Sequence, residues 1–314
     1  MIPALILRRC VLLAVTLFAV SVITFLIVNV LPGDVANAIL GDLATPDQVA
    51  SVRTRMGLDR PLVERYLEWA GGLLRGDFGV SLTHGRPIAP ILFGRFGNSI
   101  ILALISLAVA VPVSILLGVV AAVYQGSVID RVISSAVVVA FSLPEYVLAL
   151  GLILLFAMWI PILPGSSMID PGASPLSRPA ALVLPIAVIA THMLAYLSQV
   201  TRASMIATLG SGYVRTATLK GLPGWVVVAR HALRNALLPT LAEIGMNFGY
   251  TLGGLVIVET VFSYAGIGQL VVMSVETRDV PTLQAAVLVV AAAYGIGNLL
   301  ADIGSIALNP KLRS

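Results

Sequence analysis

The chain of 314 residues is strongly apolar and carries little charge, because 58% of its residues are hydrophobic and only 11% are charged. Charged residues make up about 25% of an ordinary soluble domain, so this composition excludes a soluble globular protein and indicates a membrane protein. The formal net charge of +4 does not indicate nucleic-acid binding, since no soluble face interleaves basic with aromatic residues. A single cysteine, Cys10, allows no internal disulfide, and three scattered histidines do not favour a structural zinc site.

Six apolar runs are long enough to cross a bilayer core, which takes about 20 helical residues. The first run follows Arg8 and Arg9 and resembles a signal peptide, but its 22 residues exceed the usual apolar core of about 7 to 15. We therefore interpret it as a retained span, and the sequence predicts an all-α polytopic protein with six transmembrane helices. The predicted spans are 10–31, 99–124, 132–160, 180–200, 238–262 and 282–308.

The distribution of charge predicts the orientation of these spans. With a cytoplasmic amino terminus, the inner side has a net charge of +9 and the outer side −1, and Asp130 is the one inner acid. This asymmetry is the positive-inside pattern, so we expect both termini in the cytoplasm. The inner cations are Arg8, Arg9, Arg131, Arg202, Arg215, Lys220, Arg230, Arg234, Lys311 and Arg313.

The long segment after the first span is predicted to form a small helical cap outside the membrane. Residues 45–48 have a capping-box pattern with proline at the first helical position, and Gly57 is placed to end that helix. A second helix, beginning at Asp59 or Pro61, shows an apolar stripe at helical spacing. We favour packing of this cap on the membrane part over direct substrate contact.

Two regions follow from this organisation. Residues 1–97 hold the first span and the outer helical loop, and residues 98–314 hold a five-span core. The core contains one large inner segment, residues 201–237. Within it, residues 213–220 can form two turns of helix, which the Gly-Leu-Pro-Gly of 221–224 then stops.

Charge alone fits a basic juxtamembrane loop held near anionic lipid. The residue pattern adds a second interpretation, since 213–221 followed by Leu238-Pro239 resembles the coupling loop of ABC importer permeases, where a separate ATPase docks. Further motifs are similar to the first-subunit type of the dipeptide, oligopeptide and nickel permeases. They lie at 31–34, 57–61, 66–69, 76–81, 142–146, 258–262, 266–268, 278–279 and 298–302. At 309–311 the chain reads Asn-Pro-Lys where the family usually has Asp-Pro-Arg.

This resemblance implies a MetI-like permease fold and the role of a transmembrane subunit in an ATP-driven importer of the bacterial cytoplasmic membrane, working by alternating access. The implied partners are a second homologous permease, two ATP-binding subunits or domains, and an external substrate-binding protein. The substrate class stays open among dipeptides, longer peptides, glutathione, nickel chelates and opines. The implied ATPase-coupling residues are Tyr213, Arg215, Thr216, Ala217, Lys220, Gly221, Arg230 and Arg234.

The chain has no nucleotide site of its own in this interpretation. A P-loop needs Gly-Lys-Ser/Thr, but the only lysines, Lys220 and Lys311, follow leucine and proline. We therefore expect no catalytic residue, no metal and no cofactor in this chain, with ATP and Mg²⁺ bound by the partner ATPases.

Ionisable residues inside the spans are candidates for the translocation pathway, because each costs about 2.5 to 3.5 kcal/mol at a helix centre. Glu145 follows Pro144, whose missing amide donor permits a kink, so its carboxylate could face a water-filled pathway or pair with the partner subunit. Glu259 is a further candidate, although a place near the membrane edge favours structural anchoring. Asn247 is a weaker one. We interpret His192 as a hydrogen-bonded packing residue.

Gly245, Gly249 and Gly253 repeat at intervals of four, which places them on one helix face. Such a stripe lets another helix approach closely, either within the chain or at a subunit interface.

Two other function classes are weighed against the importer. A secondary ion-coupled transporter would carry its own ion site and could show inverted repeats, of which the sequence shows none. An intramembrane hydrolase would need a nucleophile beside a base, and Ser142 near Glu145 is not such a pair. Uptake measured with and without ATP separates the three.

Overall fold

The computed structural model describes residues 2–30, 45–55, 59–170 and 172–308, and these residues are helical apart from connecting turns and one isolated bridge. Two short π-helical segments follow α7 and α10, at Leu154–Trp159 and Val227–Ala232. The helices are α1 (Ile2–Val30), α3 (Pro46–Arg55), α4 (Leu62–Leu74), α5 (Ile88–Val123), α6 (Val128–Ser142), α7 (Glu145–Ile153), α8 (Pro179–Leu209), α9 (Gly212–Leu219), α10 (Gly224–Val226), α11 (Leu233–Val261), α12 (Ile267–Glu276) and α13 (Val280–Leu308).

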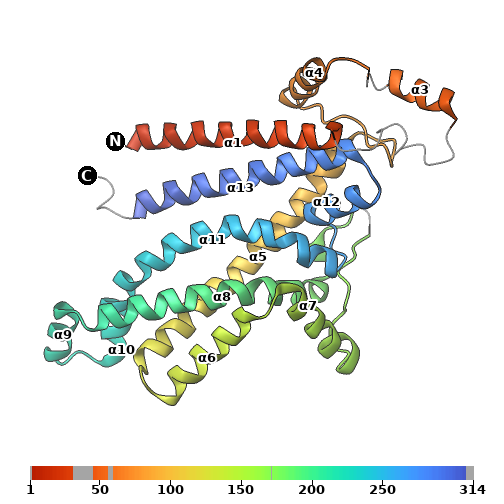
Figure 1. Cartoon of the computed structure of the whole chain (residues 1–314). Coiled ribbons are helices and arrows are strands. Elements are labelled where there is room, and N and C mark those ends of the chain that lie inside the picture. The colour runs from red at the N-terminus through yellow and green to blue at the C-terminus, as the bar shows by residue number, and fades with distance from the viewer. Residues whose placement is uncertain (1, 31–44, 56–58, 171, 309–314) are drawn as a thin grey trace.

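The long helices run between two ends of one bundle (Figure 1). In chain order, α1, α5, the α6–α7 pair, α8, α11 and α13 alternate in direction (Figure 1). One end carries the start of α1, the end of α13, and α9 with α10, whereas the other carries α3, α4 and α12. Helix α8 packs on α5, α6 and α11, and α13 packs on α11 and α1.

Four helices in the described part of the chain are long and apolar enough to cross a membrane, namely Leu7–Ile27, Ile88–Val123, Pro179–Leu209 and Val280–Ala301. The α6–α7 pair adds a fifth if the two helices are one broken span. The predicted span 238–262 lies in α11, which has 29 residues and thus a length of about 44 Å. The all-α polytopic class is confirmed, and the composition of the described helices supports four to five of the six predicted spans.

The third predicted span, 132–160, is wrong as a single helix. Helix α6 ends at Ser142 and α7 begins at Glu145, with an angle of 102° between them. Leu143 has an extended backbone, with φ −83° and ψ 127°. Proline disfavours helical backbone in the residue before it and donates no hydrogen bond, so Pro144 breaks the helix instead of only kinking it.

The predicted outer cap is found as α3 and α4. Helix α3 ends at Arg55, and the predicted stop Gly57 lies outside the described residues. Helix α4 packs on α1, where Tyr66 meets Phe25 edge to face at 5.4 Å and its hydroxyl lies 2.8 Å from Ser21 Oγ. The expectation that the cap packs on the membrane part is therefore confirmed for α4.

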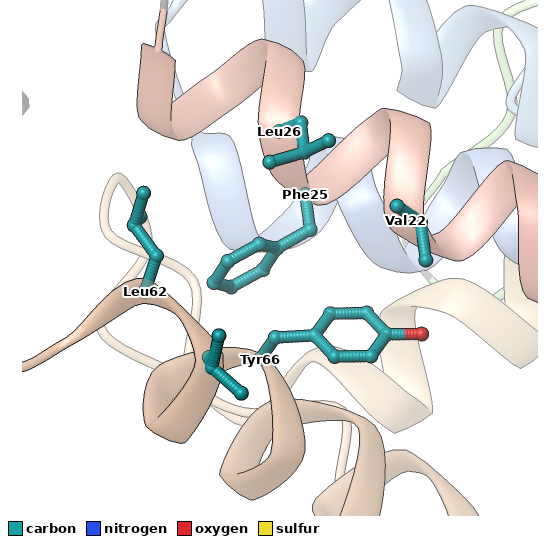
Figure 2. A pocket seen from close by; sticks show the side chains of 6 residues that line it. Val22, Phe25, Leu26, Leu62 and Tyr66 are labelled. Carbon is teal, nitrogen blue, oxygen red and sulfur yellow. The ribbon is translucent and has the colours of Figure 1, made fainter.

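A small apolar cavity of about 180 Å³ remains between α1 and α4. Figure 2 shows Phe25 and Tyr66 facing each other beside it. Its walls are Val22, Phe25, Leu26, Leu62, Val63 and Tyr66.

Glycines set how closely two pairs of helices approach. A Cβ atom at Gly118 of α5 would lie 2.6 Å from Thr201 Cβ and 2.7 Å from the Ser198 carbonyl oxygen of α8, so only glycine fits there. A Cβ at Gly245 of α11 would lie 2.8 Å from Ala301 Cβ of α13. Gly245 therefore serves packing within the chain. The surroundings of Gly249 and Gly253 lie outside what the structure describes.

Candidate functional site

The inner segment 201–237 forms the tip of the bundle at the end where the chain starts (Figure 1). Helix α8 runs to Leu209, and α9 begins three residues later at Gly212. Val214 and Ala217, spaced three apart on α9, are buried against Met205 of α8 and against the start of α11. This spacing places both side chains on one face, so the angle of α9 relative to α8 is set by apolar packing.

The other face of α9 is exposed. It presents Tyr213, Arg215, Thr216 and Lys220 to the surroundings. Ala217 is only 6% exposed, so its side chain packs α9 against the bundle and does not face a partner; its role in coupling stays a prediction. The hydroxyl of Tyr213 accepts a hydrogen bond of 2.9 Å from Asn235 Nδ2, which ties α9 to α11.

Two large apolar side chains of the same tip were missed by the sequence analysis. Leu219 is 79% exposed and Trp225 is 75% exposed. Both lie beside the Gly-Leu-Pro-Gly stop and carry no charge, so a motif search for basic coupling residues passes over them. Aromatic side chains at such exposure are typical anchors of protein interfaces.

Gly221 ends α9 by its backbone conformation. Its φ is +77°, and a Cβ atom at this position would meet nothing within 4 Å. Positive φ, and not close approach, is therefore the reason for glycine here. The amide of Gly221 donates to the Thr218 carbonyl at 3.0 Å, and Pro223 then starts α10.

Basic side chains surround this tip. Arg230 lies in the π-helical turn after α10 and Arg234 in the first turn of α11, and both are exposed. Together with Arg215 and Lys220 they make this end of the described chain electropositive. Such a surface suits a partner with carboxylates or free carbonyl groups, and equally anionic lipid.

A second polar site lies at the α6–α7 break. Glu145 is half-buried in the first turn of α7, and its Oε1 would lie 3.0 Å from a Cβ atom placed at Gly254 of α11. His192 of α8 interacts electrostatically with this carboxylate. Because Glu145 sits directly after the broken backbone, the structure brings α7, α8 and α11 together around one acidic group.

His192 was expected to be a hydrogen-bonded packing residue. Its ring lies 6.0 Å from that of Phe141. However, its buried Nδ1 has no hydrogen-bond partner among the described residues. The packing part of the expectation holds, whereas the hydrogen bond does not, and the unpaired nitrogen lies in the neighbourhood of Glu145.

The chain is similar to known transport proteins along nearly its whole length. The family "Binding-protein-dependent transport system inner membrane component" matches residues 114–314, and its N-terminal counterpart matches residues 1–115. A probable peptide ABC transporter permease of Sinorhizobium fredii is 35% identical over 311 residues, covering 98% of both chains. A glutathione transport system permease of Escherichia coli is 35% identical, also covering 98% of both chains.

The chain belongs to this permease family.

A permease of this family is an inner-membrane subunit of an ABC transporter, which is not itself catalytic. ATP is bound by partner ATPases, and substrate is delivered by a binding protein. The resemblance stated from the sequence motifs is thereby confirmed, and the secondary transporter and the intramembrane hydrolase are excluded.

A residue that lines a translocation pathway faces a water-filled space, whereas Glu259 of the permease is enclosed by its own chain. It is 0% exposed, and its carboxylate accepts hydrogen bonds from Ser99 Oγ at 2.5 Å and from the Gly268 amide at 2.7 Å. A Cβ atom at Gly266 would lie 2.1 Å from the Glu259 carboxyl carbon. The carboxylate therefore caps the start of α12, where a helix N-terminus favours negative charge.

This burial does not fit the expectation that Glu259 lines the pathway, and it supports the anchoring interpretation. The Gly-Ile-Gly of 266–268, close after Glu259 in the sequence, is the signal that could have suggested the cap. The side chain of Asn247 lies outside the described residues, so its expected role stays a prediction.

The permease has a comparable acidic contact at the end of the bundle that carries α12. Asp279 is buried and accepts hydrogen bonds from the Ser81 hydroxyl, the Leu82 amide and the Thr282 hydroxyl. It thereby ties the hairpin before α5 to the start of α13. Sequence analysis noted Arg278-Asp279 only as part of a motif.

Proposed function

We propose that this permease imports peptides or peptide-like substrates such as glutathione. Its relatives named as peptide and glutathione permeases match it along nearly their whole length, which supports this substrate class. In the proposed assembly the permease supplies half of the translocation pathway and a second homologous permease supplies the other half. Two ATP-binding subunits or domains and one external substrate-binding protein complete it.

We further propose that the segment 213–221 docks an ATPase and transmits its movement. The observation that carries this proposal is the construction of the tip, where buried Val214 and Ala217 set the angle of α9. Gly221 ends the helix abruptly. Helix α9 can transmit movement only if its angle relative to α8 is fixed, and α8 runs from α9 into the bundle.

The tip combines exposed apolar and basic groups, and this combination suits a protein partner with an acidic groove. Leu219 and Trp225 would insert as apolar anchors, and Arg215 and Lys220 would meet acidic groups around them. ATP binding would close the ATPases, tilt α9 and open the pathway outward, and hydrolysis would reset it. No covalent chemistry takes place in the permease.

The proposed orientation has both termini and the tip in the cytoplasm. It is supported by the positive charge of this end and by the common location of the start of α1, the end of α13 and α9 (Figure 1).

The test of the coupling role is charge reversal at the tip. The double variant Arg215→Glu, Lys220→Glu should stay in the membrane but lose most ATP-dependent uptake in proteoliposomes, because like charges repel the acidic docking groove. Gly221→Leu should have the same effect, since a non-glycine residue at positive φ costs about 1 to 2 kcal/mol and shifts the helix end. The measurements are ATPase co-purification and the rate of uptake per molecule of ATP hydrolysed.

Gly224→Ala is the matched control, because Gly224 has no positive φ and open space around it; it should transport normally. If the charge-reversed permease bound its ATPases and transported at the wild-type rate, the tip would be a basic loop beside lipid and the coupling proposal would be wrong.

A further inference from the structure

An ion pair joins two helices of the permease at the same end as the tip. Arg202 of α8 donates from Nε to Asp130 Oδ1 at 2.6 Å and from Nη2 to Asp130 Oδ2 at 2.7 Å. The Asp130 side chain is 6% exposed and that of Arg202 is 26% exposed. Two parallel bonds to one carboxylate restrict both the distance and the relative rotation of the two helices.

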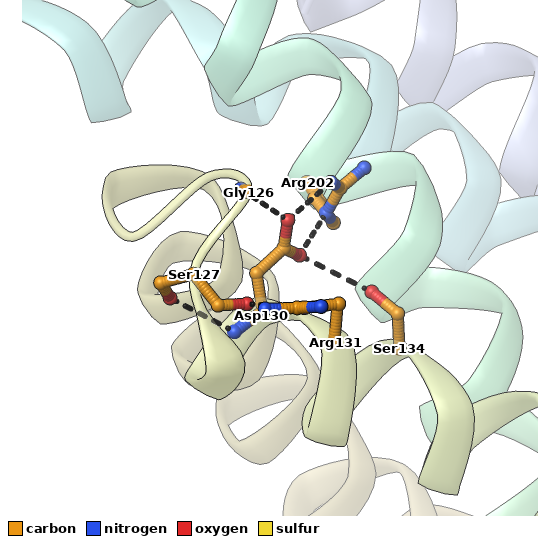
Figure 3. A network of polar contacts seen from close by, with 6 residues as sticks. All are labelled: Gly126, Ser127, Asp130, Arg131, Ser134 and Arg202. Atoms are coloured by element: carbon orange, nitrogen blue, oxygen red, sulfur yellow. Dashed lines mark hydrogen bonds and ion pairs between the residues drawn. The ribbon is translucent and has the colours of Figure 1, made fainter.

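The same carboxylate also organises the turn between α5 and α6, as Figure 3 shows. Oδ2 accepts from the Gly126 amide at 2.9 Å, where Gly126 has a φ of +78°. Oδ1 accepts from Ser134 Oγ at 3.3 Å, and Ser127 Oγ caps the Asp130 amide. Asp130 therefore joins α5, α6 and α8 at one point.

Most side chains of α6 are exposed, although the helix packs on α8 and α5. Asp130 and Val137 are its only buried residues. Its apolar side chains Val132, Val138 and Val139 are all more than half exposed. Asp130 holds one end of α6 to α8 and to the preceding turn, and the other end of α6 is the break at Pro144.

The position of Arg202 connects this pair to the tip. Arg202 lies seven residues, about two helical turns, before the end of α8 at Leu209. A change in the angle of α9 that is carried along α8 passes over these two turns, whereas a second route runs through the packing of α9 on the π-helical turn and the Tyr213–Asn235 bond to α11. Along α8, in the described chain, the first side-chain hydrogen bonds to another long helix that such a change meets are those of Arg202 with Asp130.

We propose that the Asp130–Arg202 ion pair is a positioning joint, which carries the movement of α9 from α8 into α6 and so moves α7 and Glu145 at the break. This inference rests on the proposed coupling role of 213–221. An apolar contact would let the helices slide, whereas the two-bond pair moves α6 together with α8. In this proposal α9 docks the ATPase, and the ion pair only transfers the movement of α8 to α6.

The test separates docking from transfer by measuring both. Asp130→Asn keeps the shape of the side chain but removes its charge. We expect normal membrane insertion, normal co-purification of the ATPases and basal ATP hydrolysis within about twofold of wild type. Uptake should fall about tenfold, so that the ATP hydrolysed per substrate molecule rises about tenfold.

Two further variants guard against a folding defect. Arg202→Lys keeps the charge but loses the two-bond geometry, and should give an intermediate ratio of ATP to substrate. The exchanged pair Asp130→Arg, Arg202→Asp should recover part of the coupling that each single change loses. Arg131→Gln is the matched control, because Arg131 is the exposed neighbour in sequence, and it should behave as wild type.

Spin labels give a readout that a purely structural role would not change. Labels at exposed Leu150 on α7 and exposed Ile296 on α13 should show an ATP-dependent change of distance in the wild-type complex that Asp130→Asn abolishes.

Each outcome assigns the failure to one proposal. If uptake, ATP hydrolysis and complex assembly all fall in Asp130→Asn, the ion pair is a folding contact. If uptake stays normal, the pair has no role in transport. Either result overturns the proposed joint. If the tip variants uncouple transport and Asp130→Asn does not, the joint alone is wrong. If the tip variants transport normally, the proposed coupling role is wrong.

Discussion

Glu145 and Glu259 are both acids in predicted spans, yet their surroundings differ. The carboxylate of Glu259 is fully buried and accepts three hydrogen bonds from within the chain, the third from the Gln269 amide at 3.1 Å. Glu145 is half-buried and lies against Gly254, with His192 nearby. An acid whose hydrogen bonds are satisfied internally serves structure, whereas one beside a backbone break can meet a transported group.

The first residue-scale prediction concerns Glu145. Glu145→Gln should reduce uptake severalfold because the side chain loses the charge that would attract a substrate amino group. Complex assembly and basal ATP hydrolysis should change little. The measurement is ATP-dependent uptake of a labelled peptide or glutathione together with the binding protein.

Glu276→Gln serves as its control, since Glu276 is an exposed acid at the end of α12; uptake should be unaffected. A Glu145→Gln permease that failed to assemble with its partners would show that Glu145 is an interface or folding group.

At the scale of elements, the central contact of the bundle is the crossing of α5 and α8. Gly118 leaves space for Thr201 and Ser198, while Thr201 Oγ1 lies 3.1 Å from Thr240 Oγ1 of α11. Three helices thus meet around Thr201, one residue before Arg202. The packing that positions the proposed joint therefore depends on glycine at residue 118.

Gly118→Ala is predicted to destabilise this crossing. The added methyl group would overlap Thr201 and the Ser198 carbonyl, and overpacking of this kind costs about 1 to 3 kcal/mol. Thermal unfolding of the purified permease in detergent should show a lower midpoint.

Gly97→Ala, in the same helix, tests whether the loss of stability in Gly118→Ala comes from the close approach of α5 and α8. Gly97 has open space around it, and alanine there should stabilise the helix by about 0.5 to 1 kcal/mol. Equal midpoints for the two alanine variants would contradict the close approach of α5 and α8.

At the scale of the whole molecule, function depends on which end of the bundle faces the cytoplasm. The tip, the start of α1 and the end of α13 share one end, and the outer cap helices share the other (Figure 1). A partner ATPase can reach the tip only if this end is inside.

Reporter fusions test the orientation. Fusions after Lys220 and after Arg313 should be active as cytoplasmic reporters, and a fusion near Asp170 should be active outside, because the positive charge is concentrated on the inner side. An external signal from the Arg313 fusion would overturn the proposed topology.

Much of this architecture was accessible from local patterns. Long apolar runs predicted the membrane helices, because the length of a run can be read directly from the sequence. Gly221 and the Pro-Gly at 223–224 predicted the end of α9, because glycine and proline restrict the backbone at their own positions. The break at Pro144 was underestimated as a kink. Hydropathy is continuous through 132–160, and it carries no information on the 102° angle between α6 and α7.

Composition and apolar run length determined by themselves that this chain is a helical membrane protein, because these features depend on residue type and near neighbours along the chain. The permease family followed from the resemblance of its motifs. Only the tertiary structure decided that Glu259 caps α12, that Ala217 is buried and that Asp130 pairs with Arg202, 72 residues away. Each of these contacts joins residues of separate helices. Their partners are set by how the helices pack, and only for Glu259 does a local sequence signal, the Gly-Ile-Gly of 266–268, point to the contact.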